Sequence, residues 1–132
     1  MDFFIRKNSV LPILKMKLVK DGRNDFRNFW SMMENCAITF SMKNTKTNVY
    51  KIANVTGELI QKATDIGVDD EYYIAYRWQS GDTNEIGVFV GEFNIKFFDT
   101  EQNNLEIGDL KVPIKDNLYI HILDSFTVST VV

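Results

Sequence analysis

Few side chains in this 132-residue sequence could act as a nucleophile, a base or a metal ligand. The chain has one histidine, His121, and one cysteine, Cys36. A catalytic triad needs a nucleophile, a base and an orienting group in contact, and a closed zinc site needs four N or S ligands. Cys36 lies in phase with the apolar Ile38 and Phe40, which is typical of a small buried hydrophobe. We therefore expect no enzymatic activity and no cofactor.

Carboxylates are abundant, but they point to no particular chemistry. With 18 Asp and Glu residues, some pair is always available, whereas acid–base catalysis needs a defined separation across a cleft. The densest group, Asp65, Asp69, Asp70 and Glu71, could ligate calcium through oxygen. Its spacing fits no known calcium loop, and the glycine required for the turn is missing. We interpret it as a solvated acidic loop and expect no bound metal.

Aromatic side chains could bind sugar rings by stacking. The candidates for such a carbohydrate-binding module are Tyr72, Tyr73, Trp78 and Trp30. A sugar platform needs coplanar, exposed rings. Trp78 shares the phase of Ile74, so its position favours the core over a platform.

The strands that carry these residues are recognisable from strict alternation. Tyr72, Ile74, Tyr76 and Trp78 fall on one face of one predicted strand. Phe89, Phe93, Ile95 and Phe97 fall on one face of another. Period-two alternation is typical of half-buried strands, and the connection contains turn residues. We predict a long hairpin over residues 72–98 with an aromatic inner face.

The rest of the sequence supplies further short strands and one short helix. Strands are predicted at residues 3–5, 11–19, 36–43, 49–53, 57–62, 110–114 and 118–123, and 36–43 forms a second hairpin with 49–53. Residues 26–34 break the alternation and place Phe26, Phe29, Trp30 and Met33 on one helical face. This helix could plug one end of the fold or form a contact surface. The pattern predicts an all-β antiparallel sandwich with one short helix near residues 26–34. The expected core comprises Leu14, Met16, Leu18, Ile38, Phe40, Tyr76, Trp78, Phe89, Phe93, Ile95 and Ile120.

Charge is distributed unevenly along a chain whose length favours one domain. Residues 1–62 carry 11 basic and 5 acidic side chains, and residues 63–132 carry 4 and 13. Strands from the two halves could pair within one sandwich, or basic and acidic faces of neighbouring copies could meet. No apolar run reaches the roughly 18–20 residues of a membrane span, and the start does not resemble a signal peptide. We expect neither membrane nor nucleic-acid partners.

Several short motifs follow one another in an order that resembles a known family. These are Leu11-Pro12-Ile13-Leu14, Asp21-Gly22, Phe40-Ser41-Met42-Lys43, Tyr76-Arg77-Trp78, Gly81-Asp82-Thr83, Glu92-Phe93, Val112-Pro113-Ile114 and Tyr119-Ile120-His121-Ile122. In this order they resemble the immunoglobulin-like N-terminal domain of phage baseplate upper proteins. The resemblance spans residues 3–123, nearly the whole chain.

The resemblance implies both a fold and a role. The fold is an immunoglobulin-like sandwich over residues 3–123, with residues 124–132 as a β-prone tail. The role is that of a non-enzymatic structural protein of a tailed-phage virion, placed in the tail, baseplate or head–tail collar or serving as a capsid auxiliary protein. It would be made in the cytoplasm of a bacterial host. Its partners would be other virion structural proteins and copies of itself.

The tail at residues 124–132 is the most informative segment outside the core. From Phe126 it is β-prone, has no charged side chain and is apolar at alternate places. Such a segment can add a strand to its own sheet or to a neighbouring protein, and both alternatives remain open. The candidate partner contacts are Phe126, Val128, Val131, Val132, Trp30 and Phe29.

Overall fold

A computed structural model describes residues 1–18, 36–62, 71–99, 105–114 and 116–125. These residues form an all-β fold of nine strands without a helix. The strands are β1 (Asp2–Arg6), β2 (Leu14–Leu18), β3 (Cys36–Asn44), β4 (Tyr50–Thr56), β5 (Glu58–Lys62), β6 (Glu71–Tyr76), β7 (Gly87–Asp99), β8 (Leu105–Val112) and β9 (Leu118–Leu123). The short helix predicted near residues 26–34 lies outside the described residues.

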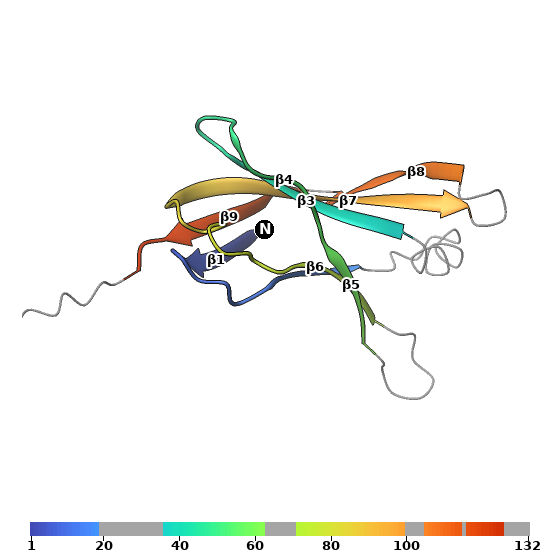
Figure 1. Cartoon of the computed structure of the whole chain (residues 1–132), viewed down its shortest axis with the longest axis horizontal. Coiled ribbons are helices and arrows are strands. Elements are labelled where there is room, and N and C mark those ends of the chain that lie inside the picture. The colour runs from blue at the N-terminus through green and yellow to red at the C-terminus, as the bar shows by residue number, and fades with distance from the viewer. Residues whose placement is uncertain (19–35, 63–70, 100–104, 115, 126–132) are drawn as a thin grey trace, which may run out of the picture.

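The strands form two sheets that pack face to face as a sandwich (Figure 1). The larger sheet has the order β1-β9-β7-β3-β4, and β8 also pairs with β7. The smaller sheet has the order β2-β6-β5. The long strand β7 pairs with β9 along residues 87–91 and with β8 along residues 93–99, so these two strands follow one another along the same side of β7.

This arrangement is immunoglobulin-like. In a variable-type immunoglobulin sandwich, strands C, C′, F and G form one sheet, while B, D and E belong to the other. In chain order, β2, β3, β4, β5, β6, β7 and β9 take the places of B, C, C′, D, E, F and G. Strand β8 is an addition between F and G. Strand β1 pairs with β9 in parallel, so the larger sheet is mixed at this edge, whereas the predicted sandwich was antiparallel.

The predicted alternation correctly identified the core. Every predicted core residue whose side chain is described is buried; the side chain of Leu18 lies outside the description. The centre of the core is aromatic: the ring of Phe40 lies 4.8 Å from the rings of both Tyr76 and Phe93. Such ring pairs contribute about 0.5–1.5 kcal/mol each beyond the area they bury. The contact between Phe40 of β3 and Tyr76 of β6 joins the two sheets.

The predicted hairpin over residues 72–98 was wrong, although both of its arms are strands. Strand β6 pairs with β2 and β5 in the smaller sheet, while β7 pairs with β3, β8 and β9 in the larger one. Alternation reveals which side of a strand is buried, but not which strand is its neighbour. The two aromatic faces were expected side by side and instead face each other across the core. The second hairpin, β3 with β4, was predicted correctly.

The two oppositely charged halves of the sequence pair with one another. Strands β1, β2 and β3 from the basic half pair with β9, β6 and β7 from the acidic half. An ion pair between Arg77 and Glu58 also joins the halves. The pairing of strands from the two halves within one sandwich agrees with the first interpretation of the charge asymmetry, and charge neutralisation between the halves stays a prediction.

Polar contacts fasten the connections at the end of the sandwich where β6 leads into β7. The indole N–H of Trp78 donates to the carbonyl of Pro12 (3.1 Å), and the hydroxyl of Thr83 donates to the carbonyl of Ser9 (2.8 Å). The phenol of Tyr76 donates to Asp82 Oδ2 (2.6 Å). Burial, and secondarily this carboxylate, raise the pKa of the Tyr76 phenol. Tyr76 therefore remains a neutral donor that ties β6 to the connection after it.

Candidate functional site

The partner contacts predicted from the sequence lie outside the described residues. This applies to Phe29 and Trp30 of the predicted helix and to Phe126, Val128, Val131 and Val132 of the tail. Asp65, Asp69 and Asp70 of the acidic segment also lie outside, as does the side chain of Glu71. These predictions therefore remain predictions.

Of the four residues proposed for a sugar-stacking platform, the structure describes the side chains of Trp78 and Tyr73. Trp78 is 4% exposed and packs edge-on against Tyr76 and Phe40, so it belongs to the core as its phase predicted. Tyr73 is half-buried in the smaller sheet, with the amine of Lys15 5.1 Å from its ring centre. Trp30 and the side chain of Tyr72 lie outside the described residues. Trp78 therefore cannot present a ring to a sugar.

His121 and Cys36 occupy opposite faces of the larger sheet. Cys36 is half-buried and packs against the core, and this desolvation raises the pKa of its thiol. His121 points outward from β9, opposite Ile120 and Ile122, as its strand position predicted. Because the sheet separates the two side chains, they cannot form a nucleophile–base pair within one molecule. Among the described residues, no three His, Cys, Asp or Glu side chains come together to hold a metal ion.

His121 instead belongs to a small cluster with the first strand. Its Nε2 lies 2.8 Å from Asp2 Oδ1, and its ring stacks on Phe4 at 4.6 Å. The hydrogen bond to His121 holds the pKa of the Asp2 carboxyl below its ordinary value. These contacts come from the parallel pairing of β1 with β9, in which Phe4 is directly opposite His121. They fasten the N-terminal strand to the sheet edge.

Two members of this cluster, Phe4 and His121, also belong to an apolar patch on the outer face of the larger sheet. The register places Phe4, His121 and Val88 side by side on β1, β9 and β7, and Leu123 follows His121 on the same face. Phe4 is 56% exposed, Val88 38% and Leu123 37%. We call Phe4, Val88 and Leu123, together with His121, the apolar patch. A contiguous exposed patch of this kind is typical of interaction surfaces.

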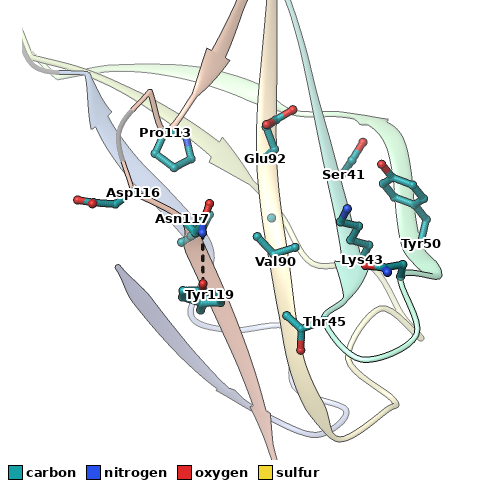
Figure 2. A pocket seen from close by; sticks show the side chains of 13 residues that line it. Ser41, Lys43, Thr45, Tyr50, Val90, Glu92, Pro113, Asp116, Asn117 and Tyr119 are labelled. Atoms are coloured by element: carbon teal, nitrogen blue, oxygen red, sulfur yellow. Dashed lines mark hydrogen bonds between the residues drawn. The ribbon is translucent and has the colours of Figure 1, made fainter.

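Beside the apolar patch, the same face contains a hollow of about 420 Å³ (Figure 2). Its floor is Val90 on the central strand β7. Ser41, Lys43 and Tyr50 line one side, and Asp116, Asn117 and Tyr119 line the other (Figure 2). Glu92 stands at one end and Thr45 at the other.

Two irregularities of the fold create the walls of this hollow. The β3–β4 ladder shifts register around Met42, next to Ser41 and Lys43. Such bulges bend a strand and re-aim its side chains. On the opposite side, the chain leaves the sheet after β8 and returns in β9, with Asp116 in the left-handed region (φ 66°). Pro113, Asp116 and Asn117, from the connection between these two strands, therefore form part of the second wall.

Several polar groups around the hollow have no protein partner in the described part of the chain. Ser41 is engaged with Asn54, and Thr45 donates to the carbonyl of Val88. Lys43, Glu92 and Asp116, by contrast, make no side-chain hydrogen bond or ion pair within the described residues. The hollow can therefore offer one ammonium group and two carboxylates to a bound molecule.

Sequence reasoning did not identify the hollow or the apolar patch. Tyr50, Lys43 and Glu92 occur in ordinary alternating strands, and the segments that form the hollow are separated by tens of residues. The outward positions opposite the core residues were the available signal, because Phe4, Val88 and Val90 are apolar where a solvated face should be polar. That signal marks an unusual face without indicating which strands share it.

Comparisons with known proteins add no relative to this description. No protein-family model, no curated protein and no solved structure matches the chain. No helix within the described residues has the length and apolar character needed to cross a membrane.

Proposed function

We propose that this chain is a non-enzymatic structural protein of a tailed-phage virion. It acts as an assembly or adaptor module in the tail, baseplate or head–tail collar, or as a capsid auxiliary protein. Its partners are other virion structural proteins and copies of itself, and it contacts neither nucleic acid nor membrane. The resemblance of residues 3–123 to the immunoglobulin-like domain of phage baseplate upper proteins supports the virion location.

The observation that carries the assembly role is the apolar patch. Its exposed aliphatic and aromatic side chains come from three neighbouring strands and share one face of the larger sheet. Its only polar side chain, His121, has its Nε2 directed to Asp2. A patch centre that is depleted of charge is characteristic of the buried part of protein interfaces. A neighbouring structural protein can cover it without desolvating an unpaired charge.

Placing a charge in the middle of the patch tests this role. Val88→Lys puts an ammonium group where a partner would bury apolar surface, whereas Val55→Lys makes the same change on β4. The two valines are a matched pair, because Val88 is 38% and Val55 40% exposed. Both variants should fold like the wild type, as judged by circular dichroism and thermal unfolding.

The measurement is incorporation into phage particles, followed by mass spectrometry of purified virions. We expect the wild type and Val55→Lys to be incorporated and Val88→Lys to be excluded or strongly depleted. Absence of the wild-type chain from purified particles would refute the virion role. Equal incorporation of the two variants would refute the apolar patch as the contact.

The sequence of the C-terminal tail, residues 124–132, predicts a second contact. Removing residues 125–132 should leave a folded protein that no longer joins its assembly if the tail adds a strand to a neighbour. A large loss of stability of the isolated protein would show instead that the tail belongs to its own sheet. Normal incorporation with unchanged stability would exclude both roles. Thermal unfolding and particle incorporation of the truncated protein distinguish these outcomes.

A further inference from the structure

We infer that the hollow on the outer face of the larger sheet is a binding site for an uncharged carbohydrate. This inference is independent of the assembly role, because it rests on the hollow and not on the apolar patch. The volume of about 420 Å³ falls within the range of roughly 300–1,000 Å³ that is typical of small-molecule sites.

The lining has the mixed character that a sugar ring requires. A pyranose presents C–H groups on its faces and hydroxyl groups around its edge. Tyr50 and Tyr119 supply aromatic surface on opposite sides, and Val90 supplies an apolar floor. Lys43 donates hydrogen bonds, Glu92 and Asp116 accept them, and a sugar hydroxyl can do both. Each of these three groups is without a protein partner in the described part of the chain.

The orientation of one wall is already set before any ligand binds. The side-chain amide of Asn117 donates to the phenol oxygen of Tyr119 (3.2 Å), shown by the dashed line in Figure 2. This hydrogen bond leaves the amide oxygen of Asn117 as an acceptor for a ligand. Fixing polar groups in advance lowers the entropic cost of binding. Asn117 and Tyr119 therefore form a preorganised side of the site.

The charges in the hollow argue against anionic ligands. Lys43 contributes one positive charge, while Glu92 and Asp116 contribute one negative charge each, which leaves a net charge of −1 at neutral pH. Recognition of phosphate, nucleic acid or acidic sugars requires a positive site. A neutral polyhydroxylated ligand can hydrogen-bond to all three groups without meeting net repulsion.

The location of the hollow argues against an extended peptide. Peptides that bind by strand addition use the free backbone of a sheet edge. The floor strand β7 is paired with β9 on one side and with β3 on the other at this position. Its backbone groups are therefore already satisfied, and recognition must come from side chains.

The test is a titration with neutral sugars, observed residue by residue. Glucose, galactose, mannose, N-acetylglucosamine and disaccharides containing them are titrated into isotope-labelled protein, and amide NMR shifts are recorded. Sialyllactose and glucose 6-phosphate serve as charged comparators. We expect at least one neutral sugar to produce saturable shifts centred on Val90, Asn117 and Tyr119. Shifts elsewhere, no saturable binding, or stronger binding of the charged sugars would overturn the inference.

A matched pair of aromatic substitutions distinguishes this site from the apolar patch. Tyr50 is 59% and Phe4 56% exposed, so replacing either with alanine removes similar exposed aromatic surface. Tyr50→Ala should weaken sugar binding about tenfold, which corresponds to the loss of one good contact, and Phe4→Ala should leave it unchanged. Equal effects of the two substitutions would refute the assignment. If the protein binds a sugar but is not incorporated into particles, the carbohydrate site is supported and the assembly role is refuted. If it is incorporated but binds no sugar, the assembly role is supported and the carbohydrate site is refuted.

Discussion

Gly91 is the position where the packing of this sandwich can be tested most sharply. A Cβ atom at Gly91 would lie 2.7 Å from Ile120 Cδ1 and 3.0 Å from two ring carbons of Phe40. Carbon atoms pack best at about 3.5–4.0 Å, so Gly91→Ala forces neighbours to move. Both neighbours are fully buried, and the Phe40 ring is held between Tyr76 and Phe93. The glycine therefore allows β7 to approach the core closely.

The expected cost follows from two opposing terms. Overpacking a tight core lowers the free energy of unfolding by about 1–3 kcal/mol. Replacing glycine by alanine lowers the entropy of the unfolded chain, which raises the free energy of unfolding by about 0.4–1 kcal/mol. We therefore expect Gly91→Ala to lower the free energy of unfolding by about 1–2 kcal/mol. Gly108 on β8 is the matched control, because a Cβ there would meet no atom within 4 Å. Gly108→Ala should be neutral or slightly stabilising.

A second substitution assigns the cost to one atom. Ile120→Val deletes the Cδ1 methyl group that a Cβ at Gly91 would strike. Alone it should destabilise by about 0.5–1.5 kcal/mol. In the Gly91→Ala protein, Ile120→Val should lower the free energy of unfolding by less than it does in the wild type, or should even raise it. The coupling energy between the two substitutions should be at least about 0.5 kcal/mol. Urea denaturation followed by circular dichroism measures all four proteins. Strict additivity, or a Gly91→Ala protein as stable as the wild type, would refute the reasoning.

Three further predictions concern the core and the edge strand. Tyr76→Phe should lower the free energy of unfolding measured by urea denaturation by about 1–3 kcal/mol, because the carboxylate of Asp82 loses the hydrogen bond from the Tyr76 hydroxyl. An unchanged denaturation midpoint would contradict this. Phe93→Ala should cost about 3–5 kcal/mol by the same measurement, because it empties the centre of the core, and a cost below about 1 kcal/mol would contradict that packing. The third concerns pH: the hydrogen bond from His121 lowers the pKa of Asp2, so its contribution to stability is present at neutral pH and is lost as the pH falls through about 4 and below. Asp2→Asn should therefore flatten the acid side of a plot of melting temperature against pH, and an unchanged plot would exclude this contribution.

The sequence by itself determined which side chains are buried. Alternation along a strand is a local property, because successive side chains point to opposite faces. The inward positions of Phe40, Tyr76, Trp78 and Phe93 could therefore be assigned before any partner was known. For the same reason the outward direction of His121 was predictable from Ile120 and Ile122 on either side of it. The all-β sandwich followed from the number and spacing of such strands.

Only the tertiary structure decided which strands are neighbours. Strands β6 and β7 both carry an aromatic face, and the connection between them is compatible either with a hairpin or with a crossing to the opposite sheet. Which of the two forms depends on partners that are distant in the sequence. Strand β6 forms its backbone hydrogen bonds with β2 and β5, while β7 forms them with β3, β8 and β9. The parallel pairing of β1 with β9, which brings Phe4 onto His121, depends on the same kind of distant choice.

The hollow also depends on the tertiary structure. Its walls come from a register shift between β3 and β4 and from the excursion between β8 and β9, and neither leaves a recognisable pattern in the residues involved. Tyr50 and Tyr119 are 69 positions apart in the sequence. They line one site because β7 holds β3 on one side and β9 on the other. A local pattern can place each tyrosine on a strand, but only the pairing of the whole sheet brings the two to opposite sides of one hollow.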